Sequence, residues 1–312
     1  MNSGRGLDWL AIVALALAAA SLSVVQAGPL ILVPVSLLIL ALPPRKPLLT
    51  VLGALIIAAT LTATFTGPLA NLDRGWPLLL GGWFVLIAAF WPSAAFLPRG
   101  LAAVAASTVS AAGLLGLSGG GWSRLDDAVA SQMQAAAAQV AAMITVMTAG
   151  RGATEVAEQL TATVYMAANF QRTVFPALLA IASLAALAVA WWAYRRLACG
   201  ERRPLAPLRE FRFDDNLIWL VIAGVVLVLI PAGDGAVRTG ANVLVFMGVL
   251  YTVRGIAIVL STIGPAPLGV IAATVAAMVF PRVVAAALLL VGLSDTWLDI
   301  RTRRRAAAGR ES

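Results

Sequence analysis

Apolar residues along the chain form long continuous runs instead of alternating with polar residues. Such runs predict helices in lipid, because about 20 apolar residues in a helix cross the hydrocarbon core and a helix satisfies its own backbone there. The predicted helices are Trp9–Gln26, Leu30–Leu42, Leu48–Thr66, Trp76–Trp91, Leu101–Leu117, Phe175–Tyr194, Leu217–Pro231, Asn242–Ile263 and Leu268–Leu298. The chain is therefore expected to be all-α, a polytopic transmembrane helical bundle with roughly eight to ten spans.

Two of these runs leave alternatives open. Leu268–Leu298 is interrupted by Pro281, so it is either one long tilted helix or two short helices that turn there. The pair is favoured, because it places the basic C-terminal tail on the same side as the other basic segments. The first run follows Arg5 and ends in small residues, so it is either a retained span, which is favoured, or a cleaved signal peptide.

Residues 122–172 are amphipathic rather than uniformly apolar. Apolar residues recur there at helical spacing, first on one face and then, after a break at 150–152, on a second one. The first face comprises Leu125, Val129, Met133, Ala136, Val140, Met143 and Met147. The pattern predicts an extramembrane amphipathic helical hairpin that lies on the membrane or packs over the bundle. The predicted parts are N-terminal membrane helices in 1–121, the hairpin in 122–172, C-terminal membrane helices in 173–300 and a basic tail in 301–312.

Composition and charge indicate how the chain sits in the membrane. Hydrophobic residues make up 61% of the chain and charged residues 12%, whereas about a quarter of the residues in soluble domains are charged. The positive charge lies in bursts beside the apolar runs, which marks cytoplasmic segments and argues against a nucleic-acid surface. The basic residues of these bursts are Arg45, Lys46, Arg99, Arg195, Arg196, Arg202, Arg203, Arg209, Arg212, Arg301, Arg303, Arg304, Arg305 and Arg310. We expect a multi-pass protein of the bacterial inner membrane, with both termini cytoplasmic and the lipid bilayer as its partner.

Residues at the ends of the runs predict interface anchors. Trp76 and Trp91 bracket one run and Trp297 closes the last one, as expected for rings at headgroup depth. A basic cytoplasmic anchor beside anionic lipid is predicted directly after Trp297. Its residues are Arg301, Arg303, Arg304 and Arg305.

The residue inventory argues against catalysis. The chain has no histidine and one cysteine, Cys199, so it can form neither a Ser-His arrangement nor a Cys/His metal site. No Walker motif is present. We therefore expect no enzyme activity, no bound metal and no cofactor.

An arginine inside an apolar run is the strongest site candidate. Arg254 lies near the middle of Asn242–Ile263, where a charged residue costs about 2.5–3.5 kcal/mol and must face the protein interior or water. It requires a carboxylate partner, for which Asp295 is the first candidate and Asp234 the second. Asn242 is expected to cap the same helix. Arg254, Asn242 and Asp295 form the predicted substrate-binding set, and a structural ion pair that fixes helix register is the open alternative.

Four stretches of the C-terminal half together resemble a known family. They read "VFPALLAIASLAALAVAWWAYRRL", "PLREFRFDDNLIWLVIAG", "GANVLVFMGVLYTVRGIAIVL" and "VGLSDTWLDIR". Over residues 173–303 the chain resembles the YybS-like family of bacterial membrane proteins of unknown function, which is distantly similar to the S components of energy-coupling-factor vitamin transporters. The family's "LQG" in the third stretch reads Val253-Arg254-Gly255 here.

The resemblance implies a transport-related membrane component that captures a small solute, with energy supplied by separate ATPase and coupling subunits. The alternative is a non-transporting scaffold or envelope regulator, whose basic cytoplasmic loop and tail recruit partners. A pocket lined by Arg254 and Asn242 would favour transport. A solid core in which a neighbour neutralises Arg254 would favour the scaffold.

Overall fold

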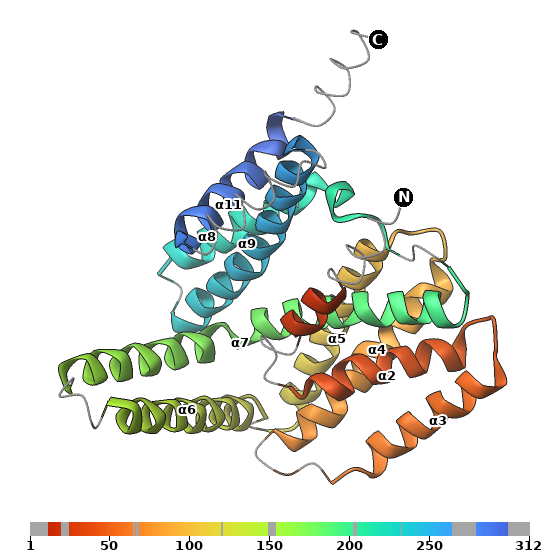
Figure 1. Cartoon of the computed structure of the whole chain (residues 1–312), viewed down its shortest axis with the longest axis horizontal. Helices are drawn as coiled ribbons and strands as arrows, with labels where there is room; N and C mark the ends of the chain where they lie inside the picture. Colours follow the sequence, from red (N-terminus) through yellow and green to blue (C-terminus); the bar gives the residue numbers. More distant parts are fainter. Residues whose placement is uncertain are drawn as a thin grey trace. The chain divides into compact units, whose positions relative to one another are not determined.

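The computed structural model describes residues 12–19, 25–64, 66, 69–119, 121–148, 154–201, 205–231, 233–263 and 279–298. All regular structure in these ranges is helical, with no strand among them (Figure 1). The prediction of an all-α helical membrane protein is confirmed. The chain divides into two compact units, Met1–Leu205 and Ala206–Ser312.

The first unit is built on a buried pair of helices, α2 (Ala27–Ala41) and α4 (Ala70–Phe90). Around them pack α3 (Pro47–Thr62), α5 (Phe96–Leu117) and α7 (Thr154–Leu197). Apolar side chains from three helices meet in the core: Leu30, Leu38, Leu80, Phe84 and Leu187 are wholly buried. They are buried because α2 packs against both α4 and α7.

Helix α7 is one continuous helix of 44 residues, so the expectation of a separate hairpin helix followed by Phe175–Tyr194 is wrong. The sequence changes there from amphipathic to apolar, but this changes the surroundings of the helix and not its backbone preference. Pro176 is the one proline inside α7, and the helix continues through it. A proline removes one backbone donor and its ring crowds the carbonyl one turn earlier, and packed neighbouring helices can accommodate both effects.

The predicted hairpin forms from α6 (Gly121–Thr148), which packs against α7. Arg172 and Asp126 join the two helices at 2.7 Å. Of the predicted apolar face, Val129 is buried, whereas Val140, Met143 and Met147 are exposed. The residues buried on α6 are Gly121, Val129, Ala130, Ala137 and Ala141. The alanine-rich face makes the contact because small side chains let two helices approach closely.

Trp76 is not an interface anchor, contrary to the prediction. Its ring is buried in the first unit, and its indole nitrogen donates a hydrogen bond to the Ser183 hydroxyl at 2.9 Å. Ser183 lies on the apolar part of α7, so the ring packs between helices. Trp91 ends its helix half-exposed, as an anchor would.

The second unit contains two short turns, η1 (Leu208–Glu210) and η2 (Asp215–Leu217), and three helices. These are α8 (Ile218–Leu229), α9 (Asp234–Ile263) and α11 (Pro281–Leu298), which lie side by side (Figure 1). Helix α9 packs against both of the others. It begins at Asp234, so the prediction that Asn242 caps it is wrong. The residues before Asn242 include no proline and continue the helix, and the Asn242 amide donates to the Arg238 carbonyl at 2.8 Å.

Four of the described helices are long and apolar enough to cross a membrane, namely Phe96–Leu117, Glu155–Leu197, Asp234–Thr262 and Pro281–Leu298. Three shorter apolar helices are Ala27–Ala41, Pro47–Thr62 and Asp215–Leu229. The total number of spans and the four-part division of the chain stay predictions. Helix α11 begins at Pro281, and the remainder of the predicted segment, residues 268–278, lies outside the described residues, as do the first residues of the chain and the basic tail.

Candidate functional site

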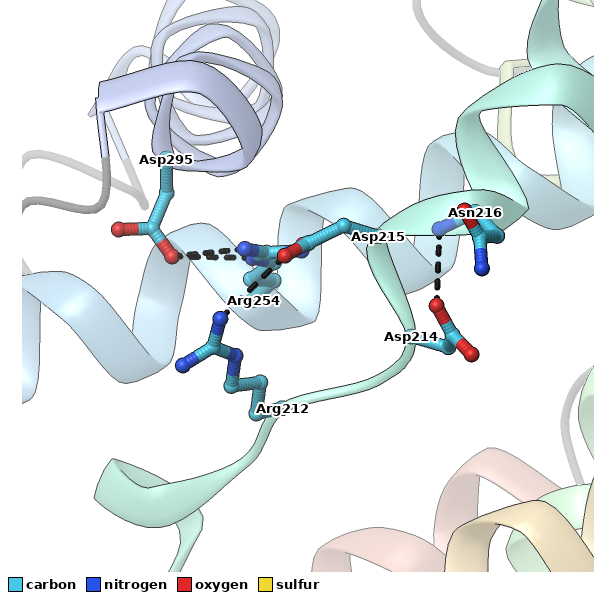
Figure 2. Close-up of polar contacts among 6 residues, drawn as sticks. All are labelled: Arg212, Asp214, Asp215, Asn216, Arg254 and Asp295. Atoms are coloured by element: carbon cyan, nitrogen blue, oxygen red, sulfur yellow. Dashed lines mark hydrogen bonds and ion pairs between the residues drawn. The ribbon is translucent and has the colours of Figure 1, made fainter.

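Arg254 lies on α9, and its side chain is 0% exposed. Figure 2 shows it between the side chains of Asp215 and Asp295. Its Nε donates to Asp295 Oδ2 at 3.0 Å, and its Nη1 donates to Asp215 Oδ1 at 2.7 Å. The two carboxylates come from different elements, Asp295 from α11 and Asp215 from η2. A charge removed from water requires such partners, because an unpaired buried ion is costly.

The position of Asp295 depends on an unusually close crossing of α9 and α11. A Cβ atom at Gly255 would lie 2.0 Å from the Leu288 carbonyl oxygen, and one at Gly292 would lie 2.0 Å from the Tyr251 carbonyl oxygen. Only glycine at both positions leaves room for the two backbones. The crossing brings Asp295, whose side chain is 3% exposed, to Arg254.

The predicted pairing of Arg254 with Asp295 is confirmed. The second candidate, Asp234, starts the same helix as Arg254. At 1.5 Å per residue, Asp234 lies about 30 Å from Arg254 along the helix axis, too far for an ion pair.

Asp215 is a second partner of Arg254 and was not predicted from the sequence. The side chain of the preceding residue, Asp214, accepts a hydrogen bond from the Asn216 backbone nitrogen at 2.9 Å, which fixes the turn (Figure 2). Asp215 is then presented to Arg254, and also to Arg212 Nη2 at 3.3 Å. Partial burial disfavours the Asp215 charge, but hydrogen bonds and charge from Arg254 and then Arg212 outweigh it, so the pKa of Asp215 lies below its ordinary value.

Aromatic side chains cover the guanidinium. The Arg254 Cζ lies 5.2 Å from the centre of the Phe213 ring, within the range of a cation–π interaction. The Phe213 ring in turn packs edge-on against Tyr251, with centroids 5.0 Å apart. The hydroxyls of Tyr251 and Thr296 are buried without a well-formed hydrogen bond among the described residues, although they are near enough to influence each other electrostatically.

Residues 10–296 match a family model described as a predicted membrane protein. The chain belongs to the DUF2232 family. The match covers the N-terminal helices as well as the C-terminal half on which the resemblance rested. No curated protein and no solved structure matches this DUF2232 chain. The further similarity to transporter S components is not part of these findings and stays a prediction.

The DUF2232 chain brings together only part of the predicted substrate-binding set. Arg254 and Asp295 meet, whereas Asn242 lies about 18 Å from Arg254 along α9 and bonds to its own helix. The substrate-binding role itself stays a prediction. Among the predicted anchors, Trp297 is exposed near the end of α11. The remaining anchors, Arg301, Arg303, Arg304 and Arg305, lie outside the described residues.

The electrostatics of the cluster are balanced. Two guanidinium groups, those of Arg212 and Arg254, face two carboxylates, those of Asp215 and Asp295. Within the described part of the chain, no three acidic, cysteine or histidine side chains gather closely enough to hold a metal ion. The arrangement can fix helices in register, and it can exchange one anionic partner of Arg254 for another.

Proposed function

We propose that this DUF2232 protein is a non-transporting membrane scaffold, in which the Arg254 cluster locks the second unit and the basic segments recruit partners. The supporting observation is that Arg254 is 0% exposed, while Asp295 accepts a hydrogen bond from its Nε and Asp215 accepts one from its Nη1. A guanidinium that contacts solutes needs a donor directed at an open site. Buried ion pairs are best attested as devices that fix register.

A buried ion pair at this position can fix the register of α9 against α11. Apolar side chains alone discriminate weakly between registers, and the close glycine crossing of α9 and α11 already excludes shifted registers in which a larger residue would meet the partner backbone. A charge in an apolar helix meets its partner in one register only, so mispaired arrangements leave Arg254 and Asp295 uncompensated. The second unit would then present its basic segment, including the exposed Arg209, in a fixed geometry.

The test is thermal unfolding of the detergent-purified chain against a panel of small solutes, including carboxylates, phosphates and amino acids. A scaffold predicts that no solute raises the melting temperature of the wild type more than that of Arg254→Met. A solute that stabilises the wild type but not Arg254→Met overturns the proposal. Cross-linking in native membranes supplies the positive readout: partner cross-links should weaken in Arg209→Gln and persist in Arg124→Gln, an exposed arginine of α6.

A second candidate function, a small-solute-binding component, is favoured by the unequal exposure of the two carboxylates. The Asp215 side chain is 39% exposed, whereas that of Asp295 is 3% exposed. The outer partner of Arg254 is therefore reachable from the surface, and the carboxylate of a solute could replace it. This exchange would use the charge-assisted hydrogen bonds that Arg254 already makes.

Chemical rescue separates the two candidates. Asp215→Ala empties the outer position next to Arg254, so for a solute-binding component acetate should restore the melting temperature where equal chloride does not. Asp295→Ala is the matched control, because its buried position is closed to acetate. Restoration of Asp215→Ala alone favours solute binding. Equal responses of the two variants to acetate and chloride favour the scaffold.

A further inference from the structure

Three basic segments of the first unit meet at one end of it, a surface that we call the basic end. They are the α2–α3 turn with Arg45 and Lys46, the start of α5 with Arg99, and the end of α7 with Arg195 and Arg196. Lys46 Nζ donates to the Leu197 carbonyl at 2.8 Å, so the α2–α3 turn lies beside the end of α7 (Figure 1). The sequence places these segments far apart.

Aromatic contacts complete the assembly. The Tyr194 hydroxyl donates to the Pro43 carbonyl at 2.5 Å. The Cζ atoms of Arg99 and Arg195 lie 5.0 and 5.3 Å from the centre of the Trp191 ring. Arg99 is itself buried and donates to the Pro92 carbonyl at 2.8 Å and to the Ala94 carbonyl. The ring and its two guanidiniums therefore hold the α4–α5 turn against α7.

The basic end has more positively charged side chains than negatively charged ones. Glu201 is its acidic partner in the described residues, and it pairs with the guanidinium of Arg195 at 2.9 Å. Arg45, Lys46 and Arg196 are exposed. The last carbonyls of α7 attract cations, and Lys46 satisfies one of them, but partial charges of a helix end do not balance three full charges.

Apolar surface begins directly beside these cations. Helix α3 starts at Pro47, and its first turns expose large aliphatic side chains. Their exposed fractions are 71% for Leu48, 57% for Val51, 46% for Leu52 and 59% for Leu55. Leu197 at the end of α7 is likewise 51% exposed. One surface thus offers ammonium and guanidinium groups at its end and hydrocarbon contacts along its side.

We propose that the basic end is a binding site for an anionic phospholipid, with the phosphodiester held by Arg45, Lys46 and Arg196 and the acyl chains lying along α3. Basic surfaces next to membrane helices attract anionic headgroups. The aliphatic side chains favour a lipid over free phosphate, because phosphate has no hydrocarbon part that could contact them. The inference goes beyond the proposed function and is independent of the role of Arg254.

The test uses the full chain in neutral detergent. Its affinity for a short-chain phosphatidylglycerol is measured by native mass spectrometry and by lipid-dependent thermal stabilisation. The variant Arg45→Gln/Lys46→Gln/Arg196→Gln should bind it more weakly by roughly tenfold to a hundredfold, given the attraction of anionic lipid for each nearby cation. The matched control, Arg124→Gln/Arg238→Gln/Arg282→Gln, loses the same charge elsewhere, Arg282 being an exposed residue of α11, and should bind like the wild type. Each glutamine retains a hydrogen-bond donor, and unfolding in the absence of lipid checks that both variants fold.

Three outcomes would overturn the proposal. Phosphatidylcholine that binds as tightly as phosphatidylglycerol would show that charge is not recognised. Inorganic phosphate that displaces the lipid at equal concentration would show that the ligand is a free anion. Equal weakening in both triple variants would show that the effect is net charge and not this surface. A separate variant, Leu48→Asn/Val51→Asn, should weaken lipid binding without changing that of inorganic phosphate, and no effect on lipid binding would also count against the site.

Discussion

Gly292 of α11 lies directly against Tyr251 of α9, so closely that a Cβ atom at residue 292 would come 2.0 Å from the Tyr251 carbonyl oxygen. The contact is between backbones, which cannot swing aside as a side chain can. The two helices therefore meet without any side chain between them, and the buried ion pair forms beside this contact.

Gly292→Ala should separate α9 from α11 and destabilise the second unit by about 1–3 kcal/mol or more, because overpacking a close contact forces the backbone to shift. Gly248→Ala on α9 is the matched control, since a Cβ atom there has open space. That change should be neutral or stabilising by up to about 1 kcal/mol, as alanine favours helix over glycine. Unfolding in mixed detergent measures both. Equal stability of the two variants would refute the close contact.

The ion pair of Arg254 with Asp295 should show strong coupling in a double-mutant cycle. Either Arg254→Met or Asp295→Leu alone leaves one charge of the pair buried and should lower the free energy of unfolding by about 3–5 kcal/mol. The double variant removes both charges and should recover most of that loss. Arg238→Met, at a half-buried position of the same helix, should lower the free energy of unfolding far less. Additive losses in the double variant would mean that the two side chains do not interact.

Stability should fall in acid partly through Asp215. Since its pKa is lowered in the folded state, its stabilising contribution is complete above the ordinary value of 3.8 and is lost as the pH falls below that value through the folded-state pKa. Asp215→Asn lacks this contribution. The difference in melting temperature between wild type and variant should be constant near neutrality and shrink below the ordinary value. A difference that does not change with pH would contradict the charge assignment.

The single cysteine gives a direct measurement of orientation. Cys199 is partly accessible and follows the Arg195-Arg196 pair, which the charge pattern assigns to the cytoplasm. A membrane-impermeant maleimide should therefore label inverted membrane vesicles and not intact spheroplasts. The Cys199→Ser variant lacks the thiol and measures the background labelling. Labelling of spheroplasts alone would reverse the predicted topology.

The sequence predicted a contact correctly where physical chemistry allows only a few possible partners. A charged residue inside an apolar helix needs a partner, and few carboxylates stand near the ends of the other helices, so Asp295 could be predicted as the partner of Arg254. Asp215 could not, because its position depends on a short turn whose geometry is fixed by the Asp214 side chain. The "FRFDDN" stretch of an otherwise apolar region is the signal that could have indicated it.

Other predictions failed because periodicity reports which residues share a face but not what that face touches. The methionine-rich face of α6 is regular, yet the alanine face makes the contact with α7. Trp76 stands at the edge of an apolar run, as an interface ring would, but Ser183 supplies a buried acceptor that no sequence pattern shows. The predicted start of a helix at Phe175 was also wrong, because a change in polarity near residue 172 does not end a helix.

The uninterrupted α7 has a mechanical consequence. With 44 residues it would extend for about 66 Å, roughly twice the thickness of the hydrocarbon layer. If the apolar half crosses the bilayer, the other half lies outside the hydrocarbon layer, together with α6, which packs against α7. A tilt of about 10° in the embedded half would swing the far tip through roughly 6 Å, so small movements within the lipid are magnified at a distance from it.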